Sequence, residues 1–523
     1  MPSSDDVLFL KDFTGGLNLT VQQQNIQPNE TPACINVDFG SRGGITLRAG
    51  WRRQVTDTDL DGAQIIAPFS GGTTTENLYM IDNDGKLCYT TGAVDNFTTS
   101  ATTVTDDITA KARMAVYGDV AYLANCRSAG SIVMKKLAHP ATVTNLTNTA
   151  NNNYASPSSG NAPLARLIAN HMGYLWWADT VESGTRYRYR VRFSHFLQPE
   201  NFADADYFDI DKNSDDEITA LVPFGAALLV FKRRSVHAIY GSGRDDFVPE
   251  RITGVSGAPN QEAVSFNAGV CYWWSTDGNV FAYNGRGVVP LGERIRGAVF
   301  LNLVDTSNSD ARVNWAAGKL YVSLVASSGT ARLLYVYDPS VGENGAWTQY
   351  DWGYTYAWWW RQSGGDALLF FIKPSVGKLF SFGDPTVLID LDTSDTPING
   401  RYFTGWQDVG ETATRKRWMR PRITAGASTE MTMFIDTYHD FNLSSTTMPR
   451  QFLPLDSGVG GGLWGDDWGD FVWSGAATTI VEFERIQRLG KSHVVALDFT
   501  VDSPTGQWWI DSIAIPFKRK AIR

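Results

Sequence analysis

The sequence contains few of the residues that usually bind metals or form cross-links. Its 523 residues include only six histidines and four cysteines. The cysteines form no CxxC pair and have no histidine nearby at ligand spacing, which argues against a structural metal site. Scattered thiols of this kind are typical of a protein assembled in a reducing cytosol, so we expect four free, buried cysteines. They are Cys34, Cys88, Cys126 and Cys271.

Catalytic motifs are missing as well. The chain has no G-x-S-x-G elbow, no HExxH motif and no P-loop. We therefore predict no enzyme activity, no catalytic residue, no cofactor and no metal site. A glycosidase stays open as an alternative, because its two carboxylates, about 5–10 Å apart, can come from distant parts of a chain. The histidines are widely spaced, and we expect them to be hydrogen-bonded on strands: His139, His171, His195, His237, His439 and His493.

The sequence also lacks segments that direct a protein into a membrane. Residues 1–13, MPSSDDVLFLKDF, have neither the basic start nor the apolar run of a secretory signal. No stretch approaches the roughly 18 apolar residues that a membrane span requires. We expect a protein that is made in the cytoplasm, stays soluble until it is assembled and does not insert into a membrane.

Positive charge is in deficit. Lysine and arginine number 45 against 55 aspartates and glutamates, so the net charge is −10 and the isoelectric point is near 5.2. A general nucleic-acid-binding protein normally presents a basic face, so this balance disfavours such a role. An acidic wall could nevertheless surround DNA, since like charges let a polyanion slide without sticking.

Aromatic residues and glycine are abundant. The 18 tryptophans, 20 tyrosines, 27 phenylalanines and 49 glycines favour sheets joined by tight turns. A glycine turn followed by an apolar strand recurs seven times, about 49 residues apart on average, and such a step is typical of a four-stranded propeller blade. We predict an all-β protein whose residues 61–395 form a β-propeller of roughly six or seven blades. The turn glycines are Gly85, Gly118, Gly173, Gly225, Gly269, Gly318 and Gly377.

The stretch WWSTDGNVFAYNGRG, residues 273–287, allows two interpretations of Asp277. A carboxylate among tryptophans could be a glycosidase acid. The pair Asp277-Gly278 could instead form a two-residue hairpin corner that supplies positive φ angles, as Asn284-Gly285 would do seven residues later. The string resembles an Asp box, but Gly278 follows Asp277 directly, and Asp boxes are themselves turns. We therefore predict a hairpin corner.

The acidic run FDIDKNSDDEIT, residues 208–219, is the best metal candidate. Its alternating Asp209, Asp211, Asn213 and Asp215 resemble a calcium loop. Serine and alanine stand where an EF-hand requires glycine and glutamate. We therefore favour a solvated loop between strands.

Two basic clusters interrupt the acidic chain. RKRWMRPR, residues 415–422, places five cations around Trp418. It could contact DNA or phosphate, but arginine and tryptophan together favour a salt-bridged strand or a subunit interface. KRR at 232–234 follows an apolar strand, so we interpret it as the charged end of a hairpin.

The two ends of the chain differ from the middle. Alternation of Met431, Met433 and Ile435 predicts long antiparallel strands and a β-sandwich-like domain over 396–523. Residues 1–60 contain strand-like pieces without an evident hairpin partner, which predicts an extended N-terminal arm. We expect this arm to clasp a neighbouring subunit in an assembly.

Three segments suit contacts with other molecules. The Asn- and Ser-rich residues 142–162 predict a long exposed loop. Tryptophans in TYAWWWR, residues 355–361, and in the Gly-rich residues 455–475 suit a partner or glycan surface, although such aromatics can also tuck onto a sheet. The Gly-rich segment contains Trp464, Trp468 and Trp473.

Several motifs resemble a known family. DFTGGLNLT (12–20) and NETPACINVDFGSRGGITLRAGW (29–51) look like the start of the tail nozzle proteins of short-tailed bacteriophages, also called tail tubular protein B. The loops at 142–162 and 455–475 have no counterpart in the family. Further similar stretches follow in the family's order at 190–202, 218–241, 254–285 and 404–423. The positions carried over from the opening motifs are Phe13, Gly15, Gly16, Leu17, Asn18, Asn36, Gly44, Arg48, Gly50 and Trp51.

The resemblance implies a structural virion protein. Such proteins contain propellers and assemble as a homohexameric ring below the portal and adaptor proteins. They extend the tail channel, help to retain and eject the DNA without sequence-specific contact, and carry tail fibre or spike proteins. The alternative is a carbohydrate-directed receptor-binding or depolymerase propeller of a phage tail, which the tryptophan-rich segments keep open.

Overall fold

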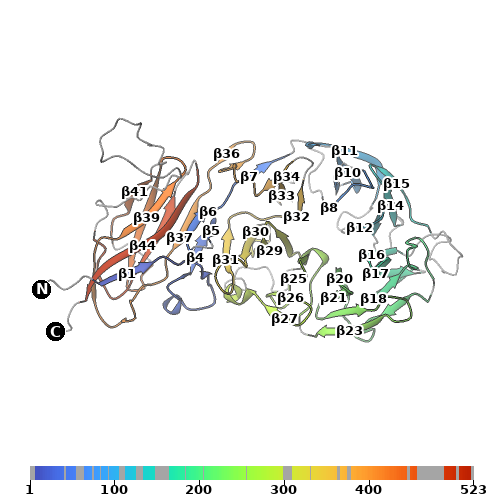
Figure 1. Ribbon diagram of the computed structural model, residues 1–523, viewed down its shortest axis with the longest axis horizontal. Coiled ribbons are helices and arrows are strands. Elements are labelled where there is room, and N and C mark those ends of the chain that lie inside the picture. The colour runs from blue at the N-terminus through green and yellow to red at the C-terminus, as the bar shows by residue number, and fades with distance from the viewer. Residues whose placement is uncertain are drawn as a thin grey trace.

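Strands dominate this protein, whose structure is a computed structural model, and the predicted all-β class is confirmed. The strands form a propeller and, beside it, a sandwich that lies at the end of the molecule holding both termini (Figure 1). Short 3-10 turns at Gln23–Asn25 (η1), Gln261–Ala263 (η2) and Gly292–Arg294 (η3) interrupt the strands. The described residues are 6–40, 43–54, 64–73, 76–82, 84–91, 93–104, 112–124, 134–147, 164–182, 184–203, 205–254, 256–297, 309–329, 331–361, 365–373, 378–443, 448–455, 488–501 and 506–519.

The propeller has seven blades within the described residues, in line with the predicted six or seven. The first strand of each blade contacts the first strand of the next, and β32 of the last blade contacts β8 of the first, so the ring is closed. The strands of each blade are given from the axis outward. Blade 1 contains β8 (Gln64–Phe69), β9 (Asn77–Ile81), β10 (Lys86–Thr91) and β11 (Ala93–Thr103), and blade 2 contains β12 (Arg113–Tyr117), β13 (Val120–Ala124), β14 (Lys135–Ala138) and β15 (Thr142–Asn145). Blade 3 contains β16 (Leu164–His171), β17 (Tyr174–Glu182), β18 (Thr185–Phe193) and β19 (Tyr207–Asp209). Blade 4 contains β20 (Ile218–Phe224), β21 (Ala227–Lys232), β22 (Val236–Tyr240) and β23 (Val248–Thr253), and blade 5 contains β24 (Val264–Asn267), β25 (Val270–Trp274), β26 (Val280–Tyr283) and β27 (Val288–Pro290). Blade 6 contains β28 (Arg312–Ala316), β29 (Lys319–Val325), β30 (Arg332–Asp338) and β31 (Ala346–Tyr350).

Blade 7 is completed by the N-terminal part of the chain. Its first three strands are β32 (Tyr356–Arg361), β33 (Ala367–Ile372) and β34 (Leu379–Phe382), and β7 (Trp51–Arg53) pairs with β34 as the fourth. The sheet continues through β35 (Asp390–Leu391) and β36 (Asp395–Thr396). A strand from the start of the chain therefore fastens the last blade before the chain enters the first.

The turn glycines mark a constant place in the blades. Five of them lie between the first and second strands of blades 2 to 6, and all have positive φ angles between 54° and 82°. Hairpins that need φ above zero favour glycine because an L side chain is strained there. Gly85 lies instead between the second and third strands of blade 1, and Gly377 lies outside the described residues. The five are Gly118, Gly173, Gly225, Gly269 and Gly318.

The sandwich consists of two sheets with one core between them. Met433 and Ile435 of β40 are fully buried in that core, as their alternation predicts, whereas Met431 is partly exposed. The first sheet contains β42 (Gly490–Ser492), β38 (Lys416–Trp418), β39 (Arg422–Ala427), β44 (Trp508–Arg519), β1 (Asp6–Leu10), β6 (Ile45–Leu47) and β5 (Val37–Phe39). The second has the order β4 (Ala33–Ile35), β37 (Gly400–Phe403), β43 (Val495–Val501), β40 (Met431–His439) and β41 (Gln451–Leu455).

The N-terminal segment is extended, and its strands pair within the same chain. β1 pairs with β44 and β4 pairs with β37, so these two strands find their partners at the other end of the same chain. β6 forms a local hairpin with β5 and also pairs with β44. A short parallel pair, β2 (Gly16–Leu17) and β3 (Glu30–Thr31), packs beside β31 of blade 6. These strands therefore form an intrachain seam, and a contact of the segment with a neighbouring subunit stays a prediction.

The motif residues of the opening segments occupy this seam. Arg48 is fully buried and donates to the Oδ1 atom of Asn36 at 2.9 Å, while Phe13 and Leu17 lie in the core that the sandwich shares with blades 5 and 6. A Cβ atom on Gly50 would lie 2.1 Å from the carbonyl oxygen of Ile389, so no larger residue fits. These positions join the two parts of the molecule.

Candidate functional site

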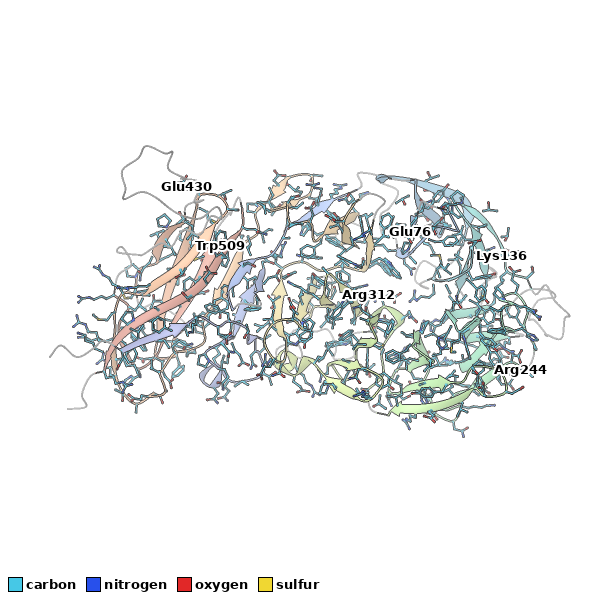
Figure 2. All side chains as sticks on the ribbon, viewed as in Figure 1. Glu76, Lys136, Arg244, Arg312, Glu430 and Trp509 are labelled. Carbon is cyan, nitrogen blue, oxygen red and sulfur yellow. The ribbon has the colours of Figure 1, made fainter. Side chains whose placement is uncertain are left out.

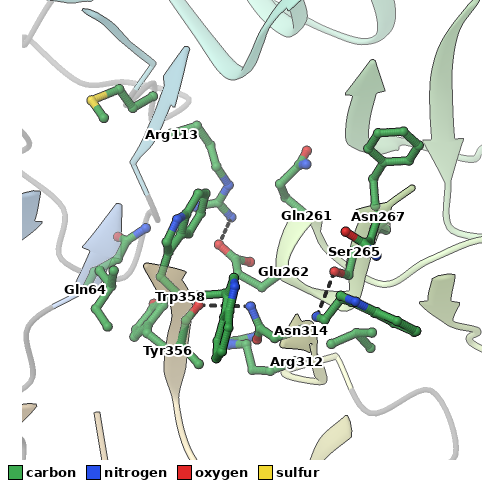
Figure 3. Close-up of a pocket in the computed structure, with 18 of the residues that line it drawn as sticks. Gln64, Arg113, Gln261, Glu262, Ser265, Asn267, Arg312, Asn314, Tyr356 and Trp358 are labelled. Atoms are coloured by element: carbon green, nitrogen blue, oxygen red, sulfur yellow. Dashed lines mark hydrogen bonds and ion pairs between the residues drawn. The ribbon is translucent and has the colours of Figure 1, made fainter. Parts of the chain in front are cut away.

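A cavity of about 650 Å³ lies where the first strands of the blades meet. Its walls come from β8, β12, β16, β24, β28 and β32, together with η2 (Figure 3). Arg312, one of its lining residues, lies on the inner side of the ring, whereas Lys136 and Arg244 lie near the outer edge (Figure 2). The volume falls within the range of about 300–1,000 Å³ that is usual for small-molecule sites.

Part of the polar lining holds neighbouring blades together. The side-chain amide of Gln64 in blade 1 donates to the Ala112 carbonyl (2.7 Å) and accepts from the Ala112 N–H (3.2 Å) of blade 2. Gln261 makes the same pair of bonds with Leu221 of blade 4, at 3.1 and 2.8 Å. The first strand of a blade has one edge without a strand partner, and these amides satisfy its backbone. Both glutamines therefore link neighbouring blades through hydrogen bonds.

A buried charged group occupies the wall of the cavity. The Arg113 Nη2 atom lies 2.5 Å from the Glu262 Oε1 atom, and the two side chains point toward each other in Figure 3. Arg312 forms an ion pair with Asp310, which also pairs with Arg332. Three guanidinium groups thus share two carboxylates. This cluster has a surplus of one positive charge.

Arg113 is the least compensated member of the cluster. Burial lowers the pKa of its guanidinium because the charged form loses hydration; Glu262 opposes this shift, and nearby Arg312 adds to it. Its buried Nε atom has no hydrogen-bond partner among the described residues. The wall of the cavity therefore contains a guanidinium group with one N–H donor, the Arg113 Nε–H, that makes no hydrogen bond to the described residues.

The aromatic lining offers one open ring. Trp315 stacks on Tyr272 with ring centroids 5.0 Å apart, and the Arg312 guanidinium lies 5.2 Å from the ring centre of Tyr356. Trp358 of β32 is 37% exposed and has no ring contact with the described residues. Of the three tryptophans in the predicted contact segment 355–361, Trp360 is buried and Trp358 is the most exposed.

The cavity does not assemble the groups of a glycosidase. Two carboxylates must flank the scissile bond, and the described lining contains one, Glu262, which is paired with Arg113. Asp277 lies elsewhere, exposed in the loop between β25 and β26. Its carboxylate accepts a hydrogen bond from the Ser275 hydroxyl at 3.3 Å.

The Asp277 corner is confirmed, with one correction. Gly278 has φ +76° and donates its N–H to the Ser275 carbonyl, whereas Asp277 does not have a positive φ. The loop runs from Ser275 to Asn279, so it is longer than the predicted two-residue turn. One glycine, rather than an Asp-Gly pair, supplies the left-handed residue.

The acidic run 208–219 and the basic run 232–234 bind each other. Glu217 pairs with Arg233 at 2.6 Å, and Asp216 accepts the backbone N–H groups of Arg233 and Arg234. The acidic run forms a loop between β19 and β20, as predicted. Exposed Arg233 and Arg234 form the charged end of the hairpin between β21 and β22, as predicted. Lys232, the last residue of β21, is fully buried and donates to the Ser214 hydroxyl at 2.8 Å.

The cluster at 415–422 divides between two faces of the first sandwich sheet. Lys416 and Trp418 are buried, and the Lys416 Nζ atom donates to the carbonyls of Glu411, Thr414 and His493. The alternate residues face outward. Exposed Arg417 stands directly opposite Lys491 on one neighbouring strand and Lys518 on the other.

The remaining predicted features are placed only in part. Cys34, Cys88 and Cys271 are buried thiols outside any disulfide, as expected. Residues 142–145, expected in a loop, form β15 in blade 2. The described part of the chain holds no cluster of three or more potential metal ligands and no helix long and apolar enough to cross a membrane. Cys126, residues 148–162, and the tryptophans Trp464, Trp468 and Trp473 lie outside the described residues.

Three buried histidines make stability depend on pH. Burial lowers the pKa values of His171, His237 and His439, because it disfavours the charged imidazole. The unfolded chain then binds more protons, so this contribution is fully present above the unfolded value of about 6.5 and is lost as pH falls toward the folded values. We expect the urea midpoint to be lower at pH 5.5 than at pH 7.5, and His171→Gln to reduce that difference. Equal midpoints at both pH values would contradict this expectation.

Arg113, Glu262 and Arg312 were not singled out by the sequence motifs. They are 149 and 50 residues apart in the sequence and meet only because the ring closes. A signal is nevertheless present: each precedes a turn glycine (Gly118, Gly269 or Gly318) by five to seven residues, which places it in the innermost strand of a blade or just before that strand. Charged residues at that offset mark the axis of the propeller.

Comparison with known proteins finds similarity of fold only. No protein-family model and no curated protein sequence matches the chain. Among solved structures, YCF48 from Cyanidioschyzon merolae is 10% identical over 65% of this chain and 100% of its own, with a TM-score of 0.38. The Pan2 WD40 domain of Neurospora crassa is 9% identical over 66% and 98% of the two chains, also at 0.38. BBS1N, solved in complex with ARL6DN, is 13% identical over 66% and 100%, at 0.38. The propeller assignment itself rests on the sheet topology.

Proposed function

We propose that this chain is a structural protein of a short-tailed phage, a subunit of the ring that forms the tail nozzle. The order of the sequence motifs that resemble this family supports the proposal, and so does the construction of the molecule. A closed propeller and a sandwich joined by an intrachain seam form a rigid platform, which suits a building block.

The observation that carries the proposal is the outer face of the first sandwich sheet. Lys491 and Arg417 stand directly opposite each other on adjacent strands, an arrangement of like charges that costs stability in an isolated chain, and Lys518 lies opposite Arg417 on the next strand. Beside them on β1, Phe9 is 64% exposed and Val7 is 39% exposed. Aromatic residues and arginine are enriched at interfaces, and a chain of net charge −10 offers an acidic partner in a second copy.

In this role the subunits would form a homohexamer below the portal and adaptor proteins of the virion. The ring would extend the tail channel, help to retain and eject the genome without reading its sequence, and carry fibre or spike proteins. An acidic wall suits passage of DNA, because like charges keep a polyanion from sticking. The alternative function, a carbohydrate-directed tail protein, is favoured by one feature, the open Trp358 ring in the axial cavity.

Reversing the charge of the basic row tests the proposal. We expect the purified protein to form a sixfold annulus with an axial hole by electron microscopy and a matching native mass. Arg417→Glu combined with Lys491→Glu should abolish the ring while leaving the fold unchanged, because both side chains are exposed. Arg286→Glu, also exposed but on the turn after β26, is the matched control and should still assemble. A wild-type protein that stays monomeric, or a double variant that assembles normally, would contradict the proposal.

A further inference from the structure

We propose that the axial cavity of the propeller binds an acidic saccharide, a sugar unit that carries one carboxylate. The proposal goes beyond the structural role in a ring and does not depend on it. It rests on three features: an open indole surface in the cavity wall, an amide in the wall that is not used to join the blades, and an arginine cluster with a surplus of one positive charge. Arg113, Glu262 and Arg312 of this cluster line the wall, whereas Arg332 and the half-exposed Asp310 lie behind it.

The indole of Trp358 provides a stacking surface. It is 37% exposed in a cavity of about 650 Å³, and no aromatic ring of the described residues covers it. Sugar rings present a flat array of C–H groups on one side, and these pack against the face of an aromatic ring through apolar contact. Trp360, two residues later on β32, is buried and so cannot serve in this way. The strand therefore leaves one of its tryptophans uncovered at the axis.

The net charge of the arginine cluster indicates that the ligand carries one carboxylate. Arg113, Arg312 and Arg332 share the carboxylates of Glu262 and Asp310, so one further carboxylate would balance the cluster. The unpartnered Nε donor of Arg113 lies in the same wall. A buried guanidinium that gains a carboxylate forms a charge-assisted hydrogen bond, which is roughly twice as strong as a neutral one. A phosphate ester would bring more negative charge than this surplus compensates.

Some of the polar side chains that line the cavity form hydrogen bonds between blades, and another is available to a ligand. Gln64 and Gln261 are used between blades, and Asn314 donates to the Ala357 carbonyl of blade 7 at 2.9 Å. The side-chain amide of Asn267 also lines the cavity and makes no hydrogen bond to the described residues. An amide donates and accepts, which suits sugar hydroxyl groups. Figure 3 shows Asn267 at one end of the lining and Gln64 at the other.

Titration with galacturonate oligomers tests the site. Tryptophan fluorescence and calorimetry should detect binding of trigalacturonate and much weaker binding of the neutral galactose trimer of the same length. Trp358→Ala should reduce affinity at least about tenfold, a loss of about 1.4 kcal/mol, because the stacking surface is removed. Trp509→Ala is the matched control, since Trp509 is also partly exposed but lies in the sandwich (Figure 2), and it should bind as the wild type does.

Substitutions of Arg113 separate charge from shape. Arg113→Gln should remove the preference for the acidic over the neutral trimer, whereas Arg113→Lys, which keeps the charge, should retain most of it. Thermal unfolding of each variant verifies that it is folded. No binding of either trimer at millimolar concentration, or equal affinity of wild type and Trp358→Ala, would overturn the proposal. Equal affinity for the acidic and neutral trimers would overturn the acidic class. None of these results depends on ring formation.

Discussion

Deleting residues 1–20 is expected to abolish folding of the whole chain. The deletion removes β1, whose five residues pair with β44, and β2, which packs beside blade 6. It also empties the core positions of Leu10, Phe13 and Leu17, which are 4%, 1% and 1% exposed. Truncating one such side chain typically costs about 2–5 kcal/mol, and a domain has only about 5–15 kcal/mol in total. Soluble expression and circular dichroism of the deletion variant measure the outcome.

Single substitutions of two phenylalanines test the same role of the N-terminal segment in a protein that still folds. Phe13 is buried against Tyr402, with ring centroids 5.4 Å apart, whereas Phe9, four residues earlier, is 64% exposed. We expect Phe13→Ala to lower the free energy of unfolding by about 3–5 kcal/mol and Phe9→Ala to change it by less than about 0.5 kcal/mol. A folded deletion variant, or equal effects of the two substitutions, would return the N-terminal segment to the role of a free arm.

The glycine series shows why the propeller could be predicted from the sequence. Gly173, Gly269 and Gly318 recur because each first hairpin of a blade needs a left-handed residue, and that requirement is local. Met172, Ala268 and Ala317 precede them with positive φ angles of their own, so these corners are two-residue turns of the primed type. The series leaves the number of blades at six or seven, because blade 7 is completed by a strand from the start of the chain.

The sequence alone does not predict which distant segments of the chain contact each other. The KRR run and the acidic run were each visible as charge clusters, but nothing in either indicates that Glu217 meets Arg233 or that Lys232 becomes buried. The partner of β1 likewise lies about 500 residues away in the chain. Such contacts depend on the closed ring and on the sandwich, which bring remote segments together only after both are formed.

The same reason explains the axial cavity. Glu262 has an ordinary sequence context, and its pairing with Arg113 exists only because blades 2 and 5 face a common axis. Trp358 was visible as part of an aromatic run, yet the run alone does not tell which of its tryptophans is covered. Alternation along β32 separates Trp359 from the other two, but Trp358 and Trp360 share a face of the strand. Trp360 is buried because it packs against blade 1, and Trp358 is not. Position within the blade, rather than residue type, separates the cavity residues from the core.

Replacing Arg48 with methionine is the second change expected to have a large effect. Its guanidinium is fully buried and donates to both carboxylate oxygens of Asp390, at 2.9 and 2.8 Å, and to Asp351 at 3.0 Å. These carboxylates raise the pKa of Arg48 against the effect of burial. Removing the cation leaves Asp390, 6% exposed, without its charge partner, and breaking a buried pair in this way costs about 3–5 kcal/mol.

Urea unfolding monitored by tryptophan fluorescence should record the Arg48→Met effect as a lower midpoint. Arg52→Met is the matched control, because Arg52 lies four residues later on β7 and is exposed, and its effect should stay within about 0.5 kcal/mol. Adding Asp390→Leu to Arg48→Met should restore part of the lost stability, because the uncompensated carboxylate is then removed as well. If Arg48→Met and Arg52→Met unfolded at the same urea concentration, the buried ion pair would not be what fastens the N-terminal segment to blade 7.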